Sequence, residues 1–200
     1  MVHPDTRIRF VSEAIGYGVF ATRDIPMGTL MYARDPLEIE ISPEKYETLD
    51  RNLREIVEKF SYMDRHGVRV LSWDHGKRAN HSCDCNTMAT AYDCEIAIRD
   101  IAQGEEITCE YGLFNVEEEM ILHCGCECCR GTLRPDDWDS YAANWDASIS
   151  AALARGGSVD QPLLHYVPKE ARTRLQALWR GQGEYESVLN LRCRHGGCSC

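Results

Sequence analysis

A cysteine-rich run is the first stretch whose residue types and spacing could do chemistry. Cys124, Cys126 and Cys129 follow the pattern C-x-C-x2-C in a hydrophilic segment. Three thiolates this close suit a tetrahedral zinc site, which needs a fourth ligand from elsewhere. The sequence predicts such a site with Cys83 as the natural fourth donor, and a set of reduced structural cysteines is the alternative. Two neighbouring thiols could substitute as ligands: Cys85 and Cys128.

The placement of all the cysteines favours metal binding over disulfides. The chain has eleven cysteines; none precedes Cys83, and three lie in the last eight residues. No apolar run approaches the length of a membrane span, and the first residues lack the apolar region of a signal peptide. We therefore expect an intracellular, reducing compartment, in which cysteines are thiols or metal ligands.

Two polar segments form a second group of chemically useful residues. The first is Asn80-His81-Ser82-Cys83, and the second is Glu106–Gly112, which ends in Tyr111. Tyr111 follows a predicted strand and precedes a glycine, a position that can present a hydroxyl at a strand end. Taken singly, these residues would be an ordinary strand tyrosine, a turn asparagine and a satisfied histidine. Their order and spacing together indicate a site.

The elements that must position these residues are mostly short strands. Residues 7–21 read as a strand, a glycine turn and a second strand, and residues 69–73 and 94–99 as further strands. Gly16-x-Gly18-x-x-Ala21 superficially matches a dinucleotide-binding fingerprint, but the turn residues Pro26 and Gly28 follow where a helix should begin. Residues 43–60 show helical spacing, with Ser42 as the cap. The unit Ala-x-Arg-Asp-Ile-x-x-Gly occurs twice, at 21–28 and 97–104.

The last third of the chain has a different, helical character. The pattern predicts helices from Pro135 and from Lys169, and a possible third over 185–191, with the tryptophans packed in the core. We find no chemistry in residues 132–192. The end of the chain contains four residues of types that bind metal, at plausible spacing: Cys193, His195, Cys198 and Cys200. Two interpretations of this segment remain open, a second metal site and a simple terminal tail.

Net charge limits the class of partner. At −10 the chain is not built to coat nucleic acid, so we expect neither direct nucleic-acid binding nor membrane association. An acidic surface suits a basic, lysine-containing protein substrate, although acidic surfaces are common without one.

The motifs resemble those of SET-domain protein lysine methyltransferases over residues 7–131. The resemblance rests on the glycine turn at 16–18, Arg78-x-Asn80-His81-Ser82-Cys83-x-x-Asn86, Gly104-Glu105-Glu106-Ile107-Thr108-x-x-Tyr111-Gly112, and the cysteine cluster followed by Arg130-Gly131. It implies a mainly β fold with helical additions: a SET-domain β-clip with a pseudoknot, a post-SET zinc site and a C-terminal helical appendage. The implied domains are a SET domain at 1–115 with a helical insert at about 42–66, a post-SET motif at 116–131, and the appendage with its Cys-rich tail at 132–200.

The same resemblance implies roles for individual residues. Tyr111 would be the catalytic tyrosine, and Cys109 would influence how many methyl groups are added. The structural zinc would be held by Cys83, Cys124, Cys126 and Cys129. The residues implied in binding S-adenosylmethionine are Gly16, Tyr17, Gly18, Arg78, Asn80, His81 and Tyr111, with the backbone near residues 122–124.

Two departures from the family pattern bear on product and substrate. The position of Cys109 commonly holds Phe or Tyr, and a small residue leaves room for dimethylation or trimethylation. The cysteine spacing is similar to that of the branch acting on lysine 20 of histone four, but Cys85 replaces the usual proline. The implied function is lysine methylation of a histone, which would place the protein in the nucleus. The alternatives are a non-histone protein substrate, with a cytoplasmic location, or a catalytically silent SET module that binds or scaffolds.

Overall fold

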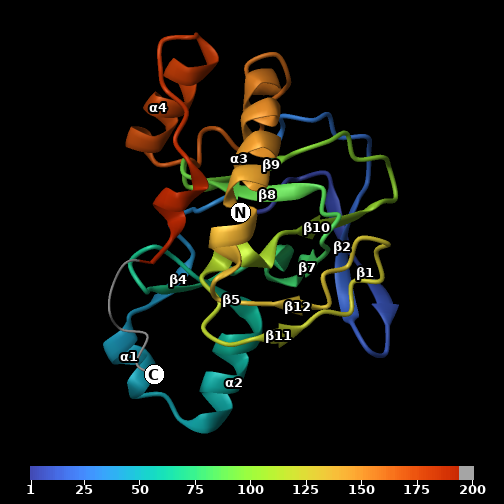
Figure 1. Ribbon diagram of the computed structural model, residues 1–200, viewed down its shortest axis with the longest axis vertical. Helices are drawn as coiled ribbons and strands as arrows, with labels where there is room; N and C mark the ends of the chain where they lie inside the picture. Colours follow the sequence, from blue (N-terminus) through green and yellow to red (C-terminus); the bar gives the residue numbers. More distant parts are fainter. Residues whose placement is uncertain (194–200) are drawn as a thin grey trace.

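A curled mixed sheet forms the centre of the protein, and two smaller sheets flank it (Figure 1). The computed structural model describes residues 1–193. The large sheet contains β1 (Thr6–Ser12), β2 (Gly16–Ala21), β3 (Leu30–Ala33), β7 (Asn80–His81), β8 (Thr87–Thr90), β9 (Cys94–Ala97) and β10 (Glu106–Cys109). The small sheets contain β4 (Ile39–Ile41), β5 (Ser61–Met63) and β6 (Arg69–Leu71), and β11 (Met120–Ile121) and β12 (Thr132–Leu133). The predicted mainly β class with helical additions is confirmed.

Strand β10 brings the two polar segments of the sequence together. It runs antiparallel to β2 and parallel to β7 and β8, with Thr108 opposite Asn80 and Cys109 opposite His81. Asn86, fully buried between β7 and β8, continues the pairing with its side chain. Its Nδ2 donates to the carbonyl of Glu106 at 2.8 Å, and its Oδ1 accepts from the amide of Thr108 at 2.9 Å. The segment that leads to Tyr111 is therefore fixed beside Asn80 and His81.

The repeated Ala-x-Arg-Asp-Ile-x-x-Gly units pack against each other. Ile25 and Ile101 exchange backbone hydrogen bonds of 2.8 and 2.9 Å. The amide of Met27 donates to Asp100 at 2.8 Å, and the amide of Gln103 donates to Asp24 at 2.7 Å. Each aspartate thus satisfies the turn of the other unit, which explains why the same turn chemistry occurs twice.

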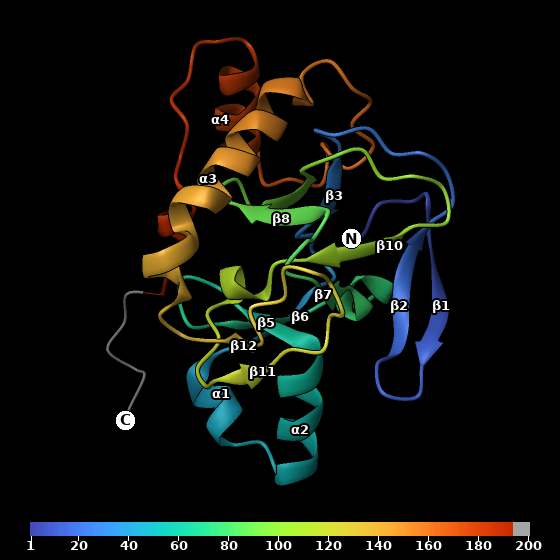
Figure 2. The same cartoon turned by 45° about the vertical axis from the view of Figure 1, so that its right-hand side comes forward.

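The helical insert differs from the single helix predicted over 43–60. It contains two helices, α1 (Pro43–Glu47) and α2 (Arg51–Phe60). Asp50 accepts a hydrogen bond from the amide of Leu53 at 3.0 Å, so it caps a new helix instead of continuing the first. Val57 is buried, whereas Leu53 and Ile56 are 47% and 49% exposed. Figure 2 shows this insert at the end of the molecule opposite the C-terminal helices.

The C-terminal helices share the core of the large sheet. α3 (Asp137–Gly156) packs on β8 and β9, and α4 (Lys169–Trp179) packs on α3. Trp138 and Trp145 are each 3% exposed, in one cluster with Leu30 and Ile96 of the sheet. The prediction that they are core residues is confirmed. Within residues 1–193, no helix is both long enough and apolar enough to span a membrane.

The possible third helix over 185–191 is only a single 3-10 turn, η3 (Val188–Leu191). Asp146 of α3 accepts hydrogen bonds from the Tyr185 hydroxyl, the Ser187 hydroxyl and the Val188 amide at 2.6, 2.6 and 2.8 Å. These three bonds hold residues 185–188 against α3, and Ser187 is extended and caps the turn, so the helical turn begins only at Val188. The tail ligands His195, Cys198 and Cys200 lie outside the described residues.

Candidate functional site

The structure brings the four predicted zinc ligands together. The Sγ atoms of Cys83, Cys124, Cys126 and Cys129 all lie within 4.8 Å of one another, although Cys83 is 41 residues from its nearest partner in sequence. The backbone amides of Arg130 and Gly131 point at Cys83 and Cys129, at 3.5 and 3.4 Å. Four cysteine sulfurs in such a cluster, two of which accept backbone N–H groups, are a donor set that could hold a structural zinc ion.

The two alternative thiols have different surroundings. Cys85 is 4% exposed and belongs to the hydrophobic core, which removes it from the metal cluster. Cys128 is exposed, with its sulfur 3.8 Å from that of Cys126, and it is not part of the group of four. The residues therefore fit a metal held by the set predicted from the sequence.

His81 connects the cysteine cluster to the tyrosine segment. Its Nε2 lies 3.4 Å from the sulfur of Cys83, and its Nδ1 lies 3.3 Å from the backbone amide of Tyr111. Burial lowers the pKa of His81 and outweighs the opposing effect of Glu110, so the ring is neutral at pH 7. With its proton on Nε2, the neutral ring accepts from the Tyr111 amide and donates to the Cys83 sulfur; with its proton on Nδ1, it donates to the Cys109 carbonyl at 3.2 Å. In either form the imidazole lies against Cys83 and helps to orient its side chain.

A buried ion-pair network closes the same region. Glu110 is 2% exposed and accepts hydrogen bonds from the Arg130 guanidinium at 2.6 and 3.0 Å and from the Gly112 amide at 2.7 Å. Asp137, at the start of α3, lies 3.3 Å from the Arg130 Nε. Arg130 directly follows the last cysteine ligand, so the network ties the cysteine segment to both the tyrosine segment and α3.

Tyr111 lies at the end of β10, as expected, and faces a large groove. Its hydroxyl donates to the carbonyl of Ala79 at 2.9 Å. Burial and the nearby Cys109, Glu95 and Glu106 raise its pKa above the usual range, so the hydroxyl stays protonated. The groove has a volume of about 1650 Å³, and Tyr111 and Cys109 are both among its lining residues.

The residues expected to bind the cofactor gather at the β2–β7 edge. The Arg78 guanidinium lies 5.5 Å from the ring centre of Tyr17, which is 50% exposed. Asn80 Nδ2 donates to the Tyr17 carbonyl at 3.3 Å and to Glu106 at 2.7 Å. Gly16 has a positive φ of 83° and open space where a side chain would lie, whereas a Cβ at Gly18 would meet Asn80. The His81 side chain is 6% exposed and turned inward, which leaves its backbone for any ligand.

The sequence reasoning passed over several residues that the site uses. Glu106 holds Asn80, and Glu110 and Arg130 lock the tyrosine segment to the cysteine segment. The sequence does contain a signal for Glu110 and Arg130. An acidic residue stands beside Tyr111 and a basic residue beside Cys129, in two segments that are expected to meet. Glu95 was read only as part of an alternating strand, yet it lines the same groove as Tyr111.

The comparisons with known proteins agree with these motifs. The family model described as the SET domain matches residues 16–112. The chain is 32% identical over 76 residues to the histone-lysine N-methyltransferase ATX2 of Arabidopsis thaliana; the match covers 34% of this chain and 7% of that protein's length. A crystal structure of a Plasmodium falciparum protein assigned to the histone methyltransferases matches with a TM-score of 0.40 and 20% identity, over 55% of this chain and 95% of the other. Residues 16–112 of the chain are therefore a SET domain.

Proposed function

We propose that the chain is a protein-lysine N-methyltransferase that uses S-adenosylmethionine and acts on a histone, in the nucleus. The observation that carries the proposal is that the Tyr111 hydroxyl and Cys109 line one groove beside the Asn80-His81 segment. The groove also suits a basic peptide, because acidic residues outnumber basic ones along it. The acidic residues that line it are Glu44, Glu47, Glu58, Glu95, Glu117, Glu118 and Glu119, against Lys59, Arg69 and Lys77.

The residues around the β2–β7 edge suit a cofactor with a sulfonium and a carboxylate. Arg78 supplies a cation, Tyr17 a half-exposed ring and Gly16 a backbone without a side chain in the way. We infer that these residues, with Gly18, Asn80 and His81, hold S-adenosylmethionine, which supplies an electrophilic methyl group.

Tyr111 then serves to align the acceptor. Because its hydroxyl donates to Ala79, its oxygen remains an acceptor that can orient the substrate amine on the line of transfer. Alignment of the amine, the methyl carbon and the sulfur contributes much of the rate in an in-line displacement. Three aromatic rings lie together along the wall of the groove: Tyr62, Phe114 and Tyr111. The centre of the Phe114 ring lies 5.3 Å from that of Tyr62 and 6.0 Å from that of Tyr111. Together these rings exclude water around the lysine stem.

Mass-resolved methyl transfer from S-adenosylmethionine tests the proposal. The substrates are core histones, nucleosomes and a whole-cell extract, and Tyr111→Phe is the matched variant. We expect labelling of histone lysine that falls about 100-fold in Tyr111→Phe, since one positioned hydroxyl contributes about that much to similar reactions. Labelling of an extract protein alone would redirect the proposal to a non-histone substrate. No transfer by a folded, zinc-loaded chain would leave a binding module.

The side chain at Cys109 is expected to set the number of methyl groups. It is 2% exposed and lines the groove next to Tyr111, so its small thiol leaves space for a methylated amine to turn. The wild-type chain should therefore produce dimethyl-lysine or trimethyl-lysine, and Cys109→Tyr should stop at monomethyl-lysine. Intact mass spectrometry of the product distinguishes these outcomes, and a wild-type product that stays monomethylated would refute the argument.

A further inference from the structure

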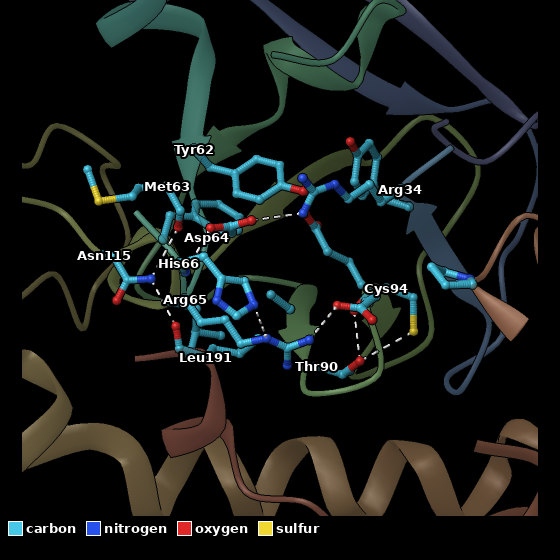
Figure 3. Close-up of a pocket in the computed structure, with 17 residues that line it drawn as sticks. Arg34, Tyr62, Met63, Asp64, Arg65, His66, Thr90, Cys94, Asn115 and Leu191 are labelled. Carbon is cyan, nitrogen blue, oxygen red and sulfur yellow. Dashed lines mark hydrogen bonds and ion pairs between the residues drawn. The ribbon is translucent and has the colours of Figure 1, made fainter. Parts of the chain in front are cut away.

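The Glu95 carboxylate lies where two hollows of the protein meet. It lines the large groove that also contains Tyr111, and it lines a second cavity of about 290 Å³. It lies on β9, between Tyr32 of the edge strand β3 and Ala89 of β8. Figure 3 shows the smaller cavity, with Tyr62 and Arg34 on one side and Arg65 and His66 on another.

Among the carboxylates that line this cavity, Glu95 is the one that forms no ion pair or hydrogen bond with another described side chain. Asp64 pairs with Arg34 at 2.9 Å, and Asp93 pairs with Arg65 at 3.4 Å. Within residues 1–193, the Glu95 carboxylate makes no hydrogen bond and no ion pair. Glu95 is partly buried, and a partly buried carboxylate usually has a partner, because desolvation of an unpaired charge is costly. An unpaired one that faces a groove is available for a cationic ligand.

The titratable side chains that surround Glu95 are mostly aromatic rings and a thiol, which are neutral at pH 7. Burial raises the pKa of Glu95 to about 7, and the Met1 amino group partly opposes this effect. Four titratable side chains from the neighbouring elements interact with its charge, and the pKa of each is raised, so each is neutral: Tyr32, Tyr62, Cys109 and Tyr111. The two cavity arginines are paired elsewhere: Arg34 with Asp64 and Glu40 at 2.9 and 2.6 Å, and Arg65 with Asp93 at 3.4 Å.

We propose that Glu95 is a catalytic residue that receives the ammonium group of the substrate lysine and removes its proton before methyl transfer. The role rests on the proposed methyltransferase function. The acidic groove guides a cationic side chain inward, and the rings of Tyr62 and Phe114 can pack against its aliphatic stem. In such a weakly polar site an ion pair gives way readily to the neutral amine and the neutral acid, because both charges are desolvated.

The proton and electron balance of this step closes. The lysine –NH3⁺ gives a proton to the Glu95 carboxylate and becomes –NH2, whose lone pair forms the new N–CH3 bond. The C–S bond breaks, and its electron pair stays on sulfur, which becomes a neutral thioether. The product is a methylammonium, and the protonated Glu95 releases one proton to water through the groove. No further reactant is needed.

The pH dependence of methyl transfer by the full-length chain tests this role. Initial rates with S-adenosylmethionine and core histones are measured from pH 6 to 10 for the wild type, Glu95→Gln and Glu95→Asp. Glu170→Gln, which removes an exposed carboxylate from α4, is the control and should match the wild type. We expect Glu95→Gln to lose about 100-fold at pH 7, as for removal of a general base. Its rate should then rise roughly tenfold per pH unit toward pH 10, because neutral lysine becomes available from solution.

Three outcomes would overturn or redirect the inference. A Glu95→Gln variant with wild-type rates refutes the role of Glu95 alone, and so does a uniform loss with an unchanged pH profile, which indicates a structural role. Glu95→Asp should retain the wild-type shape of the profile at a lower rate. If the wild type transfers no methyl group to histones or to any extract protein, the proposed function fails and this role with it.

Thermal unfolding gives a readout that does not depend on activity. A folded-state pKa raised above its unfolded value means that the ionised form of Glu95 destabilises the fold, so the penalty grows as pH rises from about 4.5 to about 7. Glu95→Gln should therefore have a Tm equal to that of the wild type at pH 5 and higher at pH 8. A lower Tm at pH 8 would show that the carboxylate has a stabilising partner and would refute its availability for lysine.

Discussion

Glu110→Gln is expected to destabilise the folded chain by about 3–5 kcal/mol, the typical cost of removing one partner of a buried ion pair. The Arg130 side chain is only 10% exposed. It would keep its charge and face a neutral amide, in which an NH2 group replaces one of the two oxygens that it now contacts at 2.6 and 3.0 Å. Asp137, at 3.3 Å from the Nε, compensates only in part. For a chain of this length the loss corresponds to a Tm lower by roughly 10 °C.

Equilibrium unfolding in urea measures this effect, and an exposed ion pair supplies the control. Glu55 pairs with Arg51 at 2.9 Å on the surface of α2, where the side chains are 59% and 91% exposed. Glu55→Gln should cost less than about 0.5 kcal/mol, since water already solvates both charges. Equal losses in the two variants would mean that Arg130 gains solvent when its partner is removed, and that the network does not hold the tyrosine segment.

The types and order of the residues were enough to predict a cluster of cysteines that could bind a metal. Cysteines within six residues must lie close together, so the open questions were the fourth ligand and the choice among neighbouring thiols. In the structure the sulfur of Cys83 joins the cluster, whereas Cys85, two residues later, lies in the core. On a regular strand the two side chains would share a face, but the chain turns at residues 83–84 and separates the two thiols. The sequence alone left both open.

The division of the helical insert shows what helical periodicity misses. Leu49, Leu53, Ile56 and Val57 recur at helical spacing, yet Asp50 begins a new helix in their midst. Whether an aspartate caps a helix or lies within one depends on the turn before it, and that turn is set by tertiary packing. Leu53 and Ile56 also remain about half exposed, so an apolar stripe did not imply burial here.

Glu95 could not be identified from the sequence, for a related reason. In the run Cys94–Ala97 it is the one charged residue, and alternation suggests a strand with one solvated face. The three-dimensional structure instead covers that face with β5 and η2 (Tyr111–Phe114), which supply Tyr62, Tyr111 and Phe114. The hollow is formed by β5, β9 and η2, three segments that are separated in the sequence. A charge in a strand becomes a buried carboxylate only through that long-range packing.

Removal of the metal is expected to have the largest effect on the region from Leu122 to Leu133. The purified chain should carry one zinc ion on the four-cysteine cluster, and Cys126→Ser should lose it, because three thiolates and a hydroxyl bind zinc far more weakly. Structural zinc contributes about 10–16 kcal/mol in small metal-dependent folds, where few other contacts exist. The described residues 116–131 are similarly poor in buried apolar side chains, with Leu122 the only one in the core set. Loss of zinc should therefore unfold this segment while the sheet and α3 remain folded.

Cys128→Ser provides the matched control, since its exposed thiol lies 3.8 Å from the sulfur of Cys126 but outside the group of four. It should retain one zinc per chain, as measured by elemental mass spectrometry, and keep slow amide exchange at Leu122, whose amide donates to Gly131 at 2.9 Å. Cys126→Ser should lose both properties. Because Arg130 sits in this segment, its release should also free Glu110, so the zinc-free chain should unfold at lower urea than the wild type. Full zinc content in Cys126→Ser would place the metal on other ligands, and zinc loss in Cys128→Ser would make that thiol a ligand.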